Sequence, residues 1–221
     1  MSIAEKLTTI AENTPKVFNA GYEKGKAESV DYIPYLSNIA FSSAISEITD
    51  DIYLDLPNAT NLNGLFRERV LNCEKVTVKV SNKCTACEWA FAGDLKDENL
   101  KTIEILGDTS AVKSFVNTFR NRKNLESIIG DFDCSSVTTF YAMFMNVFTI
   151  KEFFPKANTI KVSISFSGQS NLTDETIQAI IDGLADLTGQ ESQTVTFHAD
   201  VKAKLTDEQI STITSKNWTL A

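Results

Sequence analysis

The chain has 221 residues, of which 43% are hydrophobic and 23% are charged, so it can bury a sizeable core and is not intrinsically disordered. Its 29 acidic and 21 basic side chains give a net charge of −8, which argues against binding to nucleic-acid phosphates or anionic membranes. No apolar run reaches the roughly 20 residues that a membrane-spanning helix requires.

Residues 1–30 are predicted to form an N-terminal helix and a linker. Side chains at alternating spacings of four and three mark the seam of a short coiled coil: Ile3, Leu7, Ile10, Thr14 and Val17. Pro15 interrupts this seam, because it lacks a backbone donor. We therefore expect residues 3–17 either to dock on the repeats that follow or to join copies of the chain in a homo-oligomer.

Residues 31–166 contain a repeat built on one phenylalanine per unit. The phenylalanine returns at intervals of 25, 28 and 25 residues: Phe66, Phe91, Phe119 and Phe144. Apolar residues stand seven and four positions before each one: Ala59 and Leu62, Cys84 and Cys87, Val112 and Phe115, Val137 and Phe140. Because side chains at these offsets share one face of a helix, each unit is predicted to contain a short amphipathic helix.

Each unit is also predicted to contain one strand. Segments 76–80 and 103–105 alternate β-branched residues with polar ones, which indicates half-buried strands. Asp108 and Asp133 are placed to cap the helices that follow them. A period in this range indicates stacked units that share one core, with equivalent strands paired in parallel.

Residues 167–221 differ from the repeats and are predicted to form a C-terminal cap. The motif Leu-Thr-Asp-Glu begins at Leu172 and again at Leu205, 33 residues later, and both copies resemble helix starts. Thr206 with Gln209 fits a capping box. Two short strand candidates follow, at 195–197 and 218–220, with Trp218 covering apolar space at the end of the core.

The stretch Asp131-Phe-Asp-Cys-Ser-Ser-Val-Thr-Thr-Phe-Tyr-Ala-Met-Phe144 resembles the leucine-rich repeats of BspA-type bacterial proteins, with their recurring Asp-x-Ser-x-Val-x-x-Met-x-x-Met-Phe cadence. The resemblance spans roughly residues 45–166. It departs from that cadence in the unit of Phe91, which has three extra residues before Leu100. It implies an α/β leucine-rich-repeat solenoid with parallel strands on one side and short helices on the other, between an N-terminal helix and a C-terminal α/β cap.

Both ends of the chain carry a second resemblance. The opening Ile3-Ala-Glu-Lys-Leu-Thr-Thr-Ile-Ala-Glu-Asn13, followed by Gly21-Tyr-Glu-Lys-Gly-Lys26, is similar to the leader of repeat-containing proteins of phages and prophages of gut Firmicutes. The ending from Lys204 to Ala221 is similar to the close of the same proteins. The resemblance implies a virion component.

The cysteines allow two interpretations. Cys84 and Cys87 form a Cys-x-x-Cys pair, which can bind zinc or act in redox chemistry. The repeat alignment instead places both in core positions that other units fill with valine and phenylalanine, and we favour this interpretation. Cys73 also aligns with a core position, whereas Cys134 is expected to be partly exposed.

No residue set predicts a catalytic, cofactor or metal site. His198 is the only histidine, and acidic residues such as Asp50 with Asp51, and Asp94 with Asp97 and Glu98, are expected to be solvated. Basic pairs follow two of the repeat phenylalanines at the same offset: Arg67 and Arg69, Arg120 and Arg122. They form either a patch for an acidic glycan or protein, or ordinary solvated charge.

The sequence therefore predicts a non-enzymatic structural or interaction protein, in the first place a tail- or surface-associated phage virion component. Its partners would be a protein or glycan on the virion or host surface, with no nucleic acid and no membrane insertion. The start of the chain does not resemble a signal peptide, so we expect assembly in the host cytoplasm. The alternatives are an intracellular bacterial scaffold and, less favoured, an exported adhesin.

Overall fold

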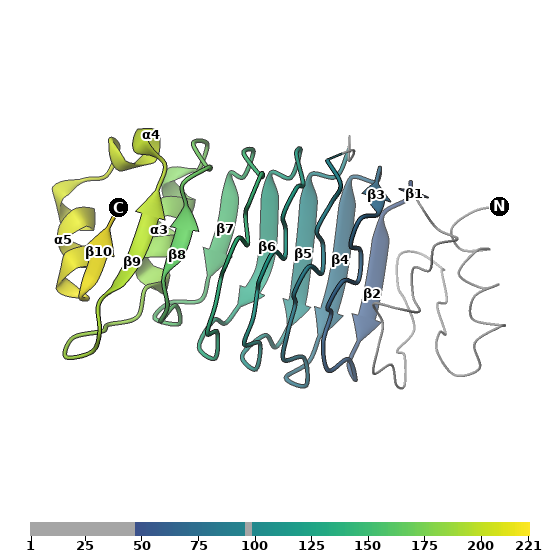
Figure 1. The fold of residues 1–221 in the computed structure, drawn as a ribbon, viewed down its shortest axis with the longest axis horizontal. Helices are drawn as coiled ribbons and strands as arrows, with labels where there is room; N and C mark the ends of the chain where they lie inside the picture. Colours follow the sequence, from purple (N-terminus) through teal and green to yellow (C-terminus); the bar gives the residue numbers. More distant parts are fainter. Residues whose placement is uncertain (1–46, 96–98) are drawn as a thin grey trace.

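The computed structural model describes residues 47–95 and 99–221 (Figure 1). The described part contains short strands and, near its C-terminal end, helices: β1 Glu47–Ile48, β2 Ile52–Leu56, β3 Val70–Leu71, β4 Lys75–Val80, β5 Thr102–Gly107, β6 Ser127–Phe132, β7 Glu152–Pro155, β8 Ile164–Phe166, α3 Asp174–Gly183, β9 Gln193–Phe197, α4 Ala199–Lys202, α5 Asp207–Ser215 and β10 Trp218–Leu220. The predicted N-terminal helix, including residues 3–17, lies outside the described residues.

The largest sheet contains β2, β4, β5, β6 and β7 in that order, all parallel. Equivalent residues of successive units lie side by side in it, as Val76, Ile103 and Ile128 do. These side chains are fully buried. A strand of this length cannot close a core alone, so the units share one. The predicted strands and their parallel pairing are confirmed.

The strands β2, β4, β5 and β6 are each followed by an irregular stretch, which we call a turn segment: 58–68, 84–93, 112–121 and 137–146. Within a segment, alternate N–H groups bond to the carbonyl three residues back, as Arg120 N does to Asn117 O (3.2 Å). The N–H groups between them reach the next segment, as Phe119 N does to Met143 O (3.1 Å). The turn segments therefore form a second layer that is hydrogen-bonded from unit to unit.

The predicted short helices are wrong, and the turn segments explain why. Successive three-residue turns bury side chains at helix-like spacings, as in Val112, Phe115 and Phe119. However, half of the N–H groups bond between units, and residues such as Asn117 (φ 55°) and Asn121 (φ 65°) adopt left-handed conformations that a helix excludes. The spacing that predicted a helix thus has a different backbone origin.

The predicted fold class, an α/β leucine-rich-repeat solenoid with strands on one side and short helices on the other, is therefore wrong. The described residues form an α/β structure whose parallel strands lie in three separate sheets, of orders β1-β3, β2-β4-β5-β6-β7 and β10-β9-β8. The few helices of this part all follow residue 173. Turn segments joined by backbone hydrogen bonds occupy the side on which helices were expected.

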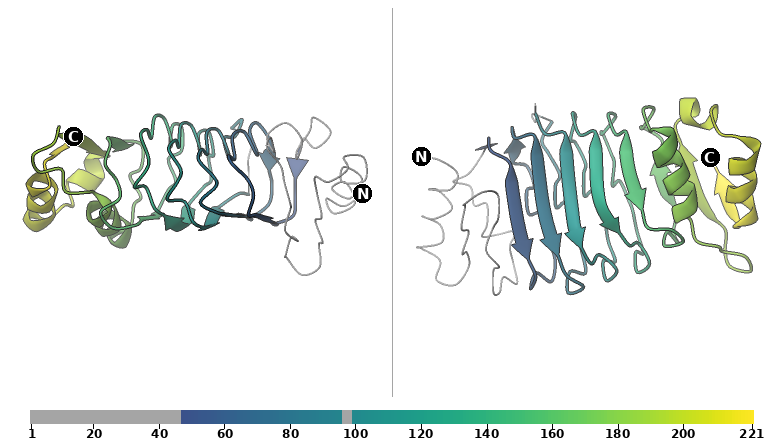
Figure 2. Two further views of the ribbon diagram at one scale, coloured as in Figure 1. Left: turned by 90° about the horizontal axis from the view of Figure 1, so that it is seen from below. Right: turned by 180° about the vertical axis from the view of Figure 1, so that it is seen from behind.

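In the C-terminal part, helices replace the strands of the large sheet, and strands replace the turn segments. Figures 1 and 2 show α3 and α5 on the side of the large sheet, and β8, β9 and β10 on the side of the turn segments. Thr173 caps α3, and Thr206 with Gln209 forms the predicted capping box of α5. The strand candidates at 195–197 and 218–220 are confirmed as parts of β9 and β10.

One column of stacked rings, which we call the phenylalanine column, runs through both parts: Phe66, Phe91, Phe119, Phe144, Phe166 and Phe197. Neighbouring ring centroids lie 5.3–6.0 Å apart. All six rings belong to one continuous buried cluster. The repeat phenylalanine therefore packs between the layers, and the same packing continues into the C-terminal part.

Candidate binding site

The four arginines for which a binding patch and ordinary solvated charge were both left open do not gather on one exposed face: Arg67, Arg69, Arg120 and Arg122. Arg122 is fully buried. Its guanidinium donates to Phe91 O, to Arg69 O (3.0 Å) and to Phe66 O (3.1 Å). Arg122 therefore satisfies backbone carbonyls of two neighbouring turn segments and is a structural residue, not a surface one.

Arg67 and Arg120 lie on the ring of Trp89. Their guanidinium carbons are 4.5 and 5.3 Å from the ring centroid, a geometry typical of cation–π contacts. Arg67 also pairs with Glu68 (3.1 Å), and Arg120 donates to Asn117 Oδ1 (3.2 Å). These two arginines therefore have partners within the protein already.

All four cysteines are free and buried: Cys73, Cys84, Cys87 and Cys134. The core interpretation of Cys84 and Cys87 agrees with this burial. A hydrogen bond with Cys84, together with complete burial, raises the pKa of the Cys87 thiol well above its usual value. The expected partial exposure of Cys134 is wrong: the residue is fully buried, and burial with the nearby Asp133 charge raises its pKa to about 12.

His198 and Asp51 have structural partners. His198 caps the short helix α4 by accepting from Asp200 N (3.2 Å). Asp51 accepts from the N–H groups of Glu74 (2.9 Å) and Lys75 (2.8 Å). Asp97 and Glu98 lie outside the described residues. Within the described ranges, no group of three or more histidine, cysteine or acidic residues is placed to hold a metal ion.

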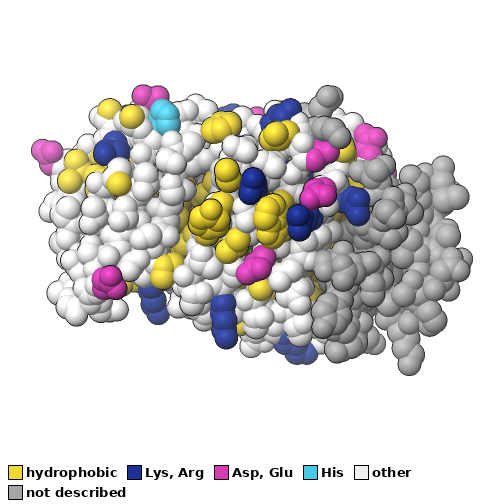
Figure 3. All heavy atoms as spheres, viewed as in Figure 1, with side chains coloured by type: hydrophobic (Ala, Val, Ile, Leu, Met, Phe, Trp, Pro, Cys, Tyr) yellow, Lys and Arg dark blue, Asp and Glu magenta, His cyan; other side chains and the backbone are white. Residues whose placement is uncertain are grey.

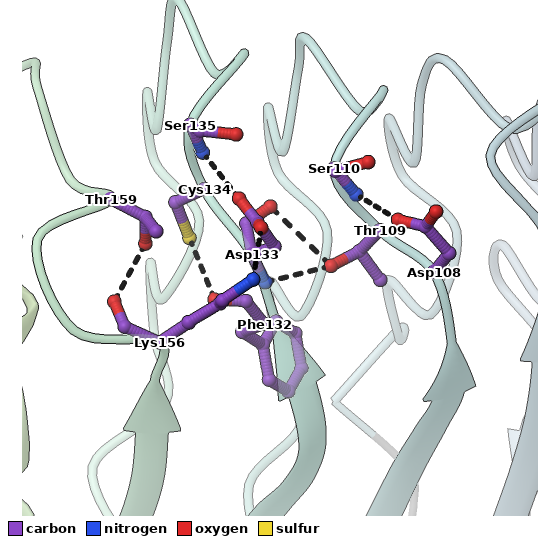
Figure 4. Close-up of polar contacts among 9 residues, drawn as sticks. All are labelled: Asp108, Thr109, Ser110, Phe132, Asp133, Cys134, Ser135, Lys156 and Thr159. Carbon is purple, nitrogen blue, oxygen red and sulfur yellow. Dashed lines mark hydrogen bonds and ion pairs between the residues drawn. The ribbon is translucent and has the colours of Figure 1, made fainter.

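A row of polar turns follows the strand ends at one edge of the large sheet (Figure 4). Asp108 accepts from Ser110 N (2.9 Å), and Asp133 accepts from Ser135 N (3.0 Å), so both form local turns and neither caps a helix as predicted. Asp133 also pairs with Lys156 (2.9 Å).

The carboxylates of this row are held ionised. Burial raises the pKa of Asp133, but the hydrogen bonds from Ser135 and Lys156 outweigh it, and the pKa lies below the usual value. Hydrogen bonds from Ser110 lower the pKa of Asp108. A polar hollow of about 580 Å³ lies beside the row. The polar groups of this edge already bind one another. The edge is therefore less suited to a ligand than the groove between turn segment 137–146 and the strands β8 and β9.

A larger groove, of about 790 Å³, separates the last turn segment, 137–146, from the strands β8 and β9. Ser165 and Thr196 lie side by side on β8 and β9 and line the groove, whereas the neighbouring Ile164 and Phe166 are buried. The turn segment thus forms one wall. The outer face of the sheet β10-β9-β8, which we call the small sheet, forms the floor. Its volume is within the range typical of ligand sites.

The rim of the groove is apolar. Tyr141 is 72% exposed, Met145 45%, and Phe148 60%. Figure 3 shows hydrophobic side chains gathered near the centre of this face. The described residues that line the groove include no aspartate, glutamate, lysine, arginine or histidine. In a chain with a net charge of −8, an uncharged apolar groove is a distinct surface.

The backbone ladder of the turn segments ends at this groove. The N–H groups of segment 112–121 reach carbonyls of the last segment at 2.9–3.2 Å: Phe115 to Thr139, Asn117 to Tyr141, Phe119 to Met143 and Asn121 to Met145. The equivalent N–H groups of the last segment, which we call the free edge, belong to Phe140, Ala142, Phe144 and Asn146. Among the described residues, no carbonyl or side chain accepts a hydrogen bond from these four N–H groups. No backbone hydrogen bond joins this described segment to β8.

Side chains close the bottom and one end of the groove. The rings of Phe144 and Phe166 are in contact below it, with centroids 5.3 Å apart. At one end, Gln169 donates to Val147 O, and Gly168 lies against the ring of Phe148. The groove is therefore bounded by packed residues and presents the free edge along its wall.

Reasoning from the sequence did not identify this groove, although one signal was present. Equivalent positions in the preceding unit are Val116 for Tyr141, Arg120 for Met145 and Lys123 for Phe148. A single buried face cannot accommodate so many apolar residues between positions 140 and 148. The excess of apolar residues in this one unit marks an exposed apolar surface.

Comparisons with protein-family models, with curated proteins and with solved structures find no match. In the part of the chain that the structure describes, no helix combines the length and the apolar character needed to span a bilayer. The BspA and phage resemblances therefore stay predictions from the sequence.

Proposed function

We propose that this chain is a non-enzymatic binding protein that takes a protein partner in the groove, and that it works as a component of a phage virion. The observation that carries the binding role is the apolar rim of Tyr141, Met145 and Phe148 around an uncharged groove. Exposed aromatic and methionine side chains around a concave surface are typical of protein interfaces.

The chemistry of the groove supports binding over catalysis. The polar side chains that line it are serine, threonine, asparagine and glutamine, with one tyrosine hydroxyl at the rim. General acid–base catalysis needs groups whose pKa lies near the working pH, and these side chains do not titrate there. Hydroxyl and amide groups instead supply hydrogen bonds that orient a partner.

The virion setting is supported by the resemblance of both chain ends to phage and prophage proteins. Particles assemble in the host cytoplasm and are released by lysis, so a virion protein reaches the outside without an export signal. A partner on the virion or the host surface would then occupy the groove. An intracellular scaffold would use the same groove for a bacterial protein.

A photo-cross-linking experiment tests both parts of the proposal. Tyr141 is replaced by p-benzoylphenylalanine, and a matched variant carries the same residue at Ile210, an exposed apolar position on α5. After illumination of particles purified from lysed cells, mass spectrometry identifies the chain and anything cross-linked to it. We expect the chain in particles, with a discrete cross-linked protein from position 141 and none from position 210.

Other outcomes would contradict the proposal in distinct ways. Expression of the gene without the chain in purified particles would remove the virion role. Cross-linking from position 141 to a bacterial protein in intact cells, with no chain in particles, would favour the scaffold. Equal cross-linking from both positions would show that the groove is not the binding site.

A further inference from the structure

We infer that the occupant of the groove is an extended, uncharged polypeptide segment that adds as a strand to the free edge of turn segment 137–146. The inference rests on the proposed binding function and specifies the chemistry of the partner. It is carried by three features of the groove: the residue interval between its backbone donors, the absence of charge among its described lining residues, and its pairing of an apolar rim with a polar floor.

The donors of the free edge recur at the same residue interval as the acceptors of an extended chain. The free edge offers N–H groups at every second residue, from Phe140 to Asn146. An extended strand presents carbonyls toward one side at every second residue, about 6.6 Å apart. Addition of such a strand to an open edge is a known mode of peptide recognition.

The protein already pairs the alternate N–H groups of one turn segment with carbonyls of the next three times, with a turn segment on both sides of each pairing. In one instance, the N–H groups of segment 84–93 reach carbonyls of segment 112–121 at 2.8–3.0 Å: Cys87 to Ser114, Trp89 to Val116, Phe91 to Thr118 and Gly93 to Arg120. The added strand would take the position that the next segment takes in the repeats. The groove interface therefore continues an interface that exists inside the fold.

Charge complementarity selects the kind of segment. A charged side chain in this groove would lose water without gaining an opposite charge, because none of the described residues that line it is charged. Successive side chains of a strand point to opposite sides, so one set would contact the apolar rim at Tyr141 and Met145. The other set would face Ser165 and Thr196 on the floor. We therefore expect alternating apolar and small polar residues in the partner.

An acyl chain is a poorer occupant of the same groove. It would fill the apolar rim but would cover the N–H groups of the free edge without accepting from them. A buried donor that loses its water without a new acceptor costs about 1–3 kcal/mol. Four such donors, which include Phe140 and Ala142, favour a ligand with carbonyls at regular spacing.

The test uses a synthetic peptide with the sequence of residues 111–121, in which Lys113→Thr and Arg120→Thr remove the two charges. Carbonyls of this segment already accept from N–H groups of another segment in the fold. A scrambled peptide of the same composition is the control. In amide exchange followed by NMR on the full chain, we expect at least about tenfold slower exchange at Phe140, Ala142, Phe144 and Asn146 with the copied peptide. Tyr141 and Met143 should not change, because their N–H groups already bond within the segment.

Two matched variants locate the binding site. Ser165→Arg places a long charged side chain in the groove, and Thr219→Arg places one on the outer face of β10, away from the groove. Both positions are exposed on the same small sheet. We expect Ser165→Arg to weaken peptide binding at least about tenfold and Thr219→Arg to change it less than about twofold.

Several results would overturn the inference. The copied peptide could fail to bind the unsubstituted chain at about 1 mM, or the scrambled peptide could protect the same amides equally. The two arginine variants could also bind the copied peptide with equal affinity. Protection of the same amides in a peptide-free dimer would assign the groove to a second copy. Binding of short-chain phosphatidylcholine in place of the peptide would assign it to a lipid. If position 141 still cross-links in particles, the proposed function stands and only the extended-segment inference fails.

Discussion

The repeats and the C-terminal part support the same phenylalanine column in different ways. In the repeats, each ring comes from a turn segment whose backbone is hydrogen-bonded to its neighbours. In the C-terminal part, Phe166 and Phe197 lie on regular strands, and helices cover the other side. Ring packing continues across the boundary while the backbone ladder of the turn segments does not. The groove lies at this boundary, where ring packing continues and backbone hydrogen bonding between turn segments ends.

Both regions use a cationic side chain to donate to backbone carbonyls. In the repeats, buried Arg122 donates to carbonyls of two turn segments. In the C-terminal part, Lys216 donates to Ile181 O (3.1 Å) and Leu184 O (2.8 Å), where α3 ends. Lys216 is partly exposed, and burial lowers its pKa despite the carboxylates nearby. The fork of arginine spans carbonyls of different units, whereas the ammonium of lysine serves one helix end.

The largest expected effect tests this difference. Arg122→Ala should lower the free energy of unfolding by about 4 kcal/mol or more, because several buried carbonyls would lose a charged donor together and a buried cavity would remain. Arg122→Lys should restore little of it, since one ammonium cannot reach both segments. Lys216→Ala should cost only about 1–2 kcal/mol, because water reaches that helix end. Urea unfolding measures all three. Equal losses for Arg122→Ala and Lys216→Ala would contradict the comparison.

The strands could be predicted from the sequence because alternation of β-branched residues is a local property. Val76 and Ile103 stand in β4 and β5, as their neighbours in the sequence indicate. The turn segments could not be predicted in the same way. A helix and a run of three-residue turns bury side chains at similar spacings, and only the pairing of N–H groups between units distinguishes them.

The role of Arg122 and the groove depend on distant parts of the chain. Arg122 resembles a surface arginine in the sequence, and its carbonyl partners at Phe66 and Phe91 lie 56 and 31 residues away. The groove depends on the interval from Phe144 to Phe166, which is 22 residues where the other units have 25 or 28. Ring packing is kept across this shorter interval, but the backbone of β8 does not pair with the last turn segment.

The second prediction asks whether the two regions unfold as one unit. Phe197→Ala should cost about 3 kcal/mol or more, because it removes a buried ring from the C-terminal end of the column. The two tryptophans report on different regions, Trp89 on the repeats and Trp218 on the C-terminal part. Urea unfolding of Trp89→Phe and Trp218→Phe chains follows one region at a time. We expect Phe197→Ala to shift both transitions together.

Separate transitions would contradict that expectation. If only the Trp218 signal shifts, the phenylalanine column does not couple the two regions, and each region is a stability unit of its own. Phe66→Ala, at the other end of the column, is the matched control. It should shift the same two signals by a comparable amount, since its ring is equally buried.

A third, smaller effect concerns the polar turns of the repeats. Asp133→Asn keeps a side-chain oxygen for the bond from Ser135 and removes the ion pair with Lys156. We expect a loss of about 0.5–1 kcal/mol at pH 7, because the lysine is largely exposed. The pKa of Asp133 is lowered in the folded state, so its contribution is present above about pH 4 and lost as the pH falls through that lowered value.

The pH dependence is measured by urea unfolding of both proteins between about pH 7 and pH 2. The difference between them should shrink as the pH falls below about 4. Asp108→Asn is the control, because Asp108 forms the same turn one unit earlier and makes no ion pair among the described residues. A difference that stays constant down to pH 2 would show that the ion pair does not stabilise the turn.

The smallest expected effect concerns the surface of the repeats, where Arg67 and Arg120 share Trp89. Arg67→Ala should lower the free energy of unfolding by about 0.5 kcal/mol, since an exposed cation–π contact contributes little. In a Trp218→Phe background it should also change the emission of Trp89, whereas Arg67→Lys, which keeps a cation over the ring, should change it less. A loss above about 2 kcal/mol would mean that Arg67 contributes to the free energy of unfolding on a scale closer to that of Arg122. The contrast between buried and exposed arginines in the repeats would then be wrong.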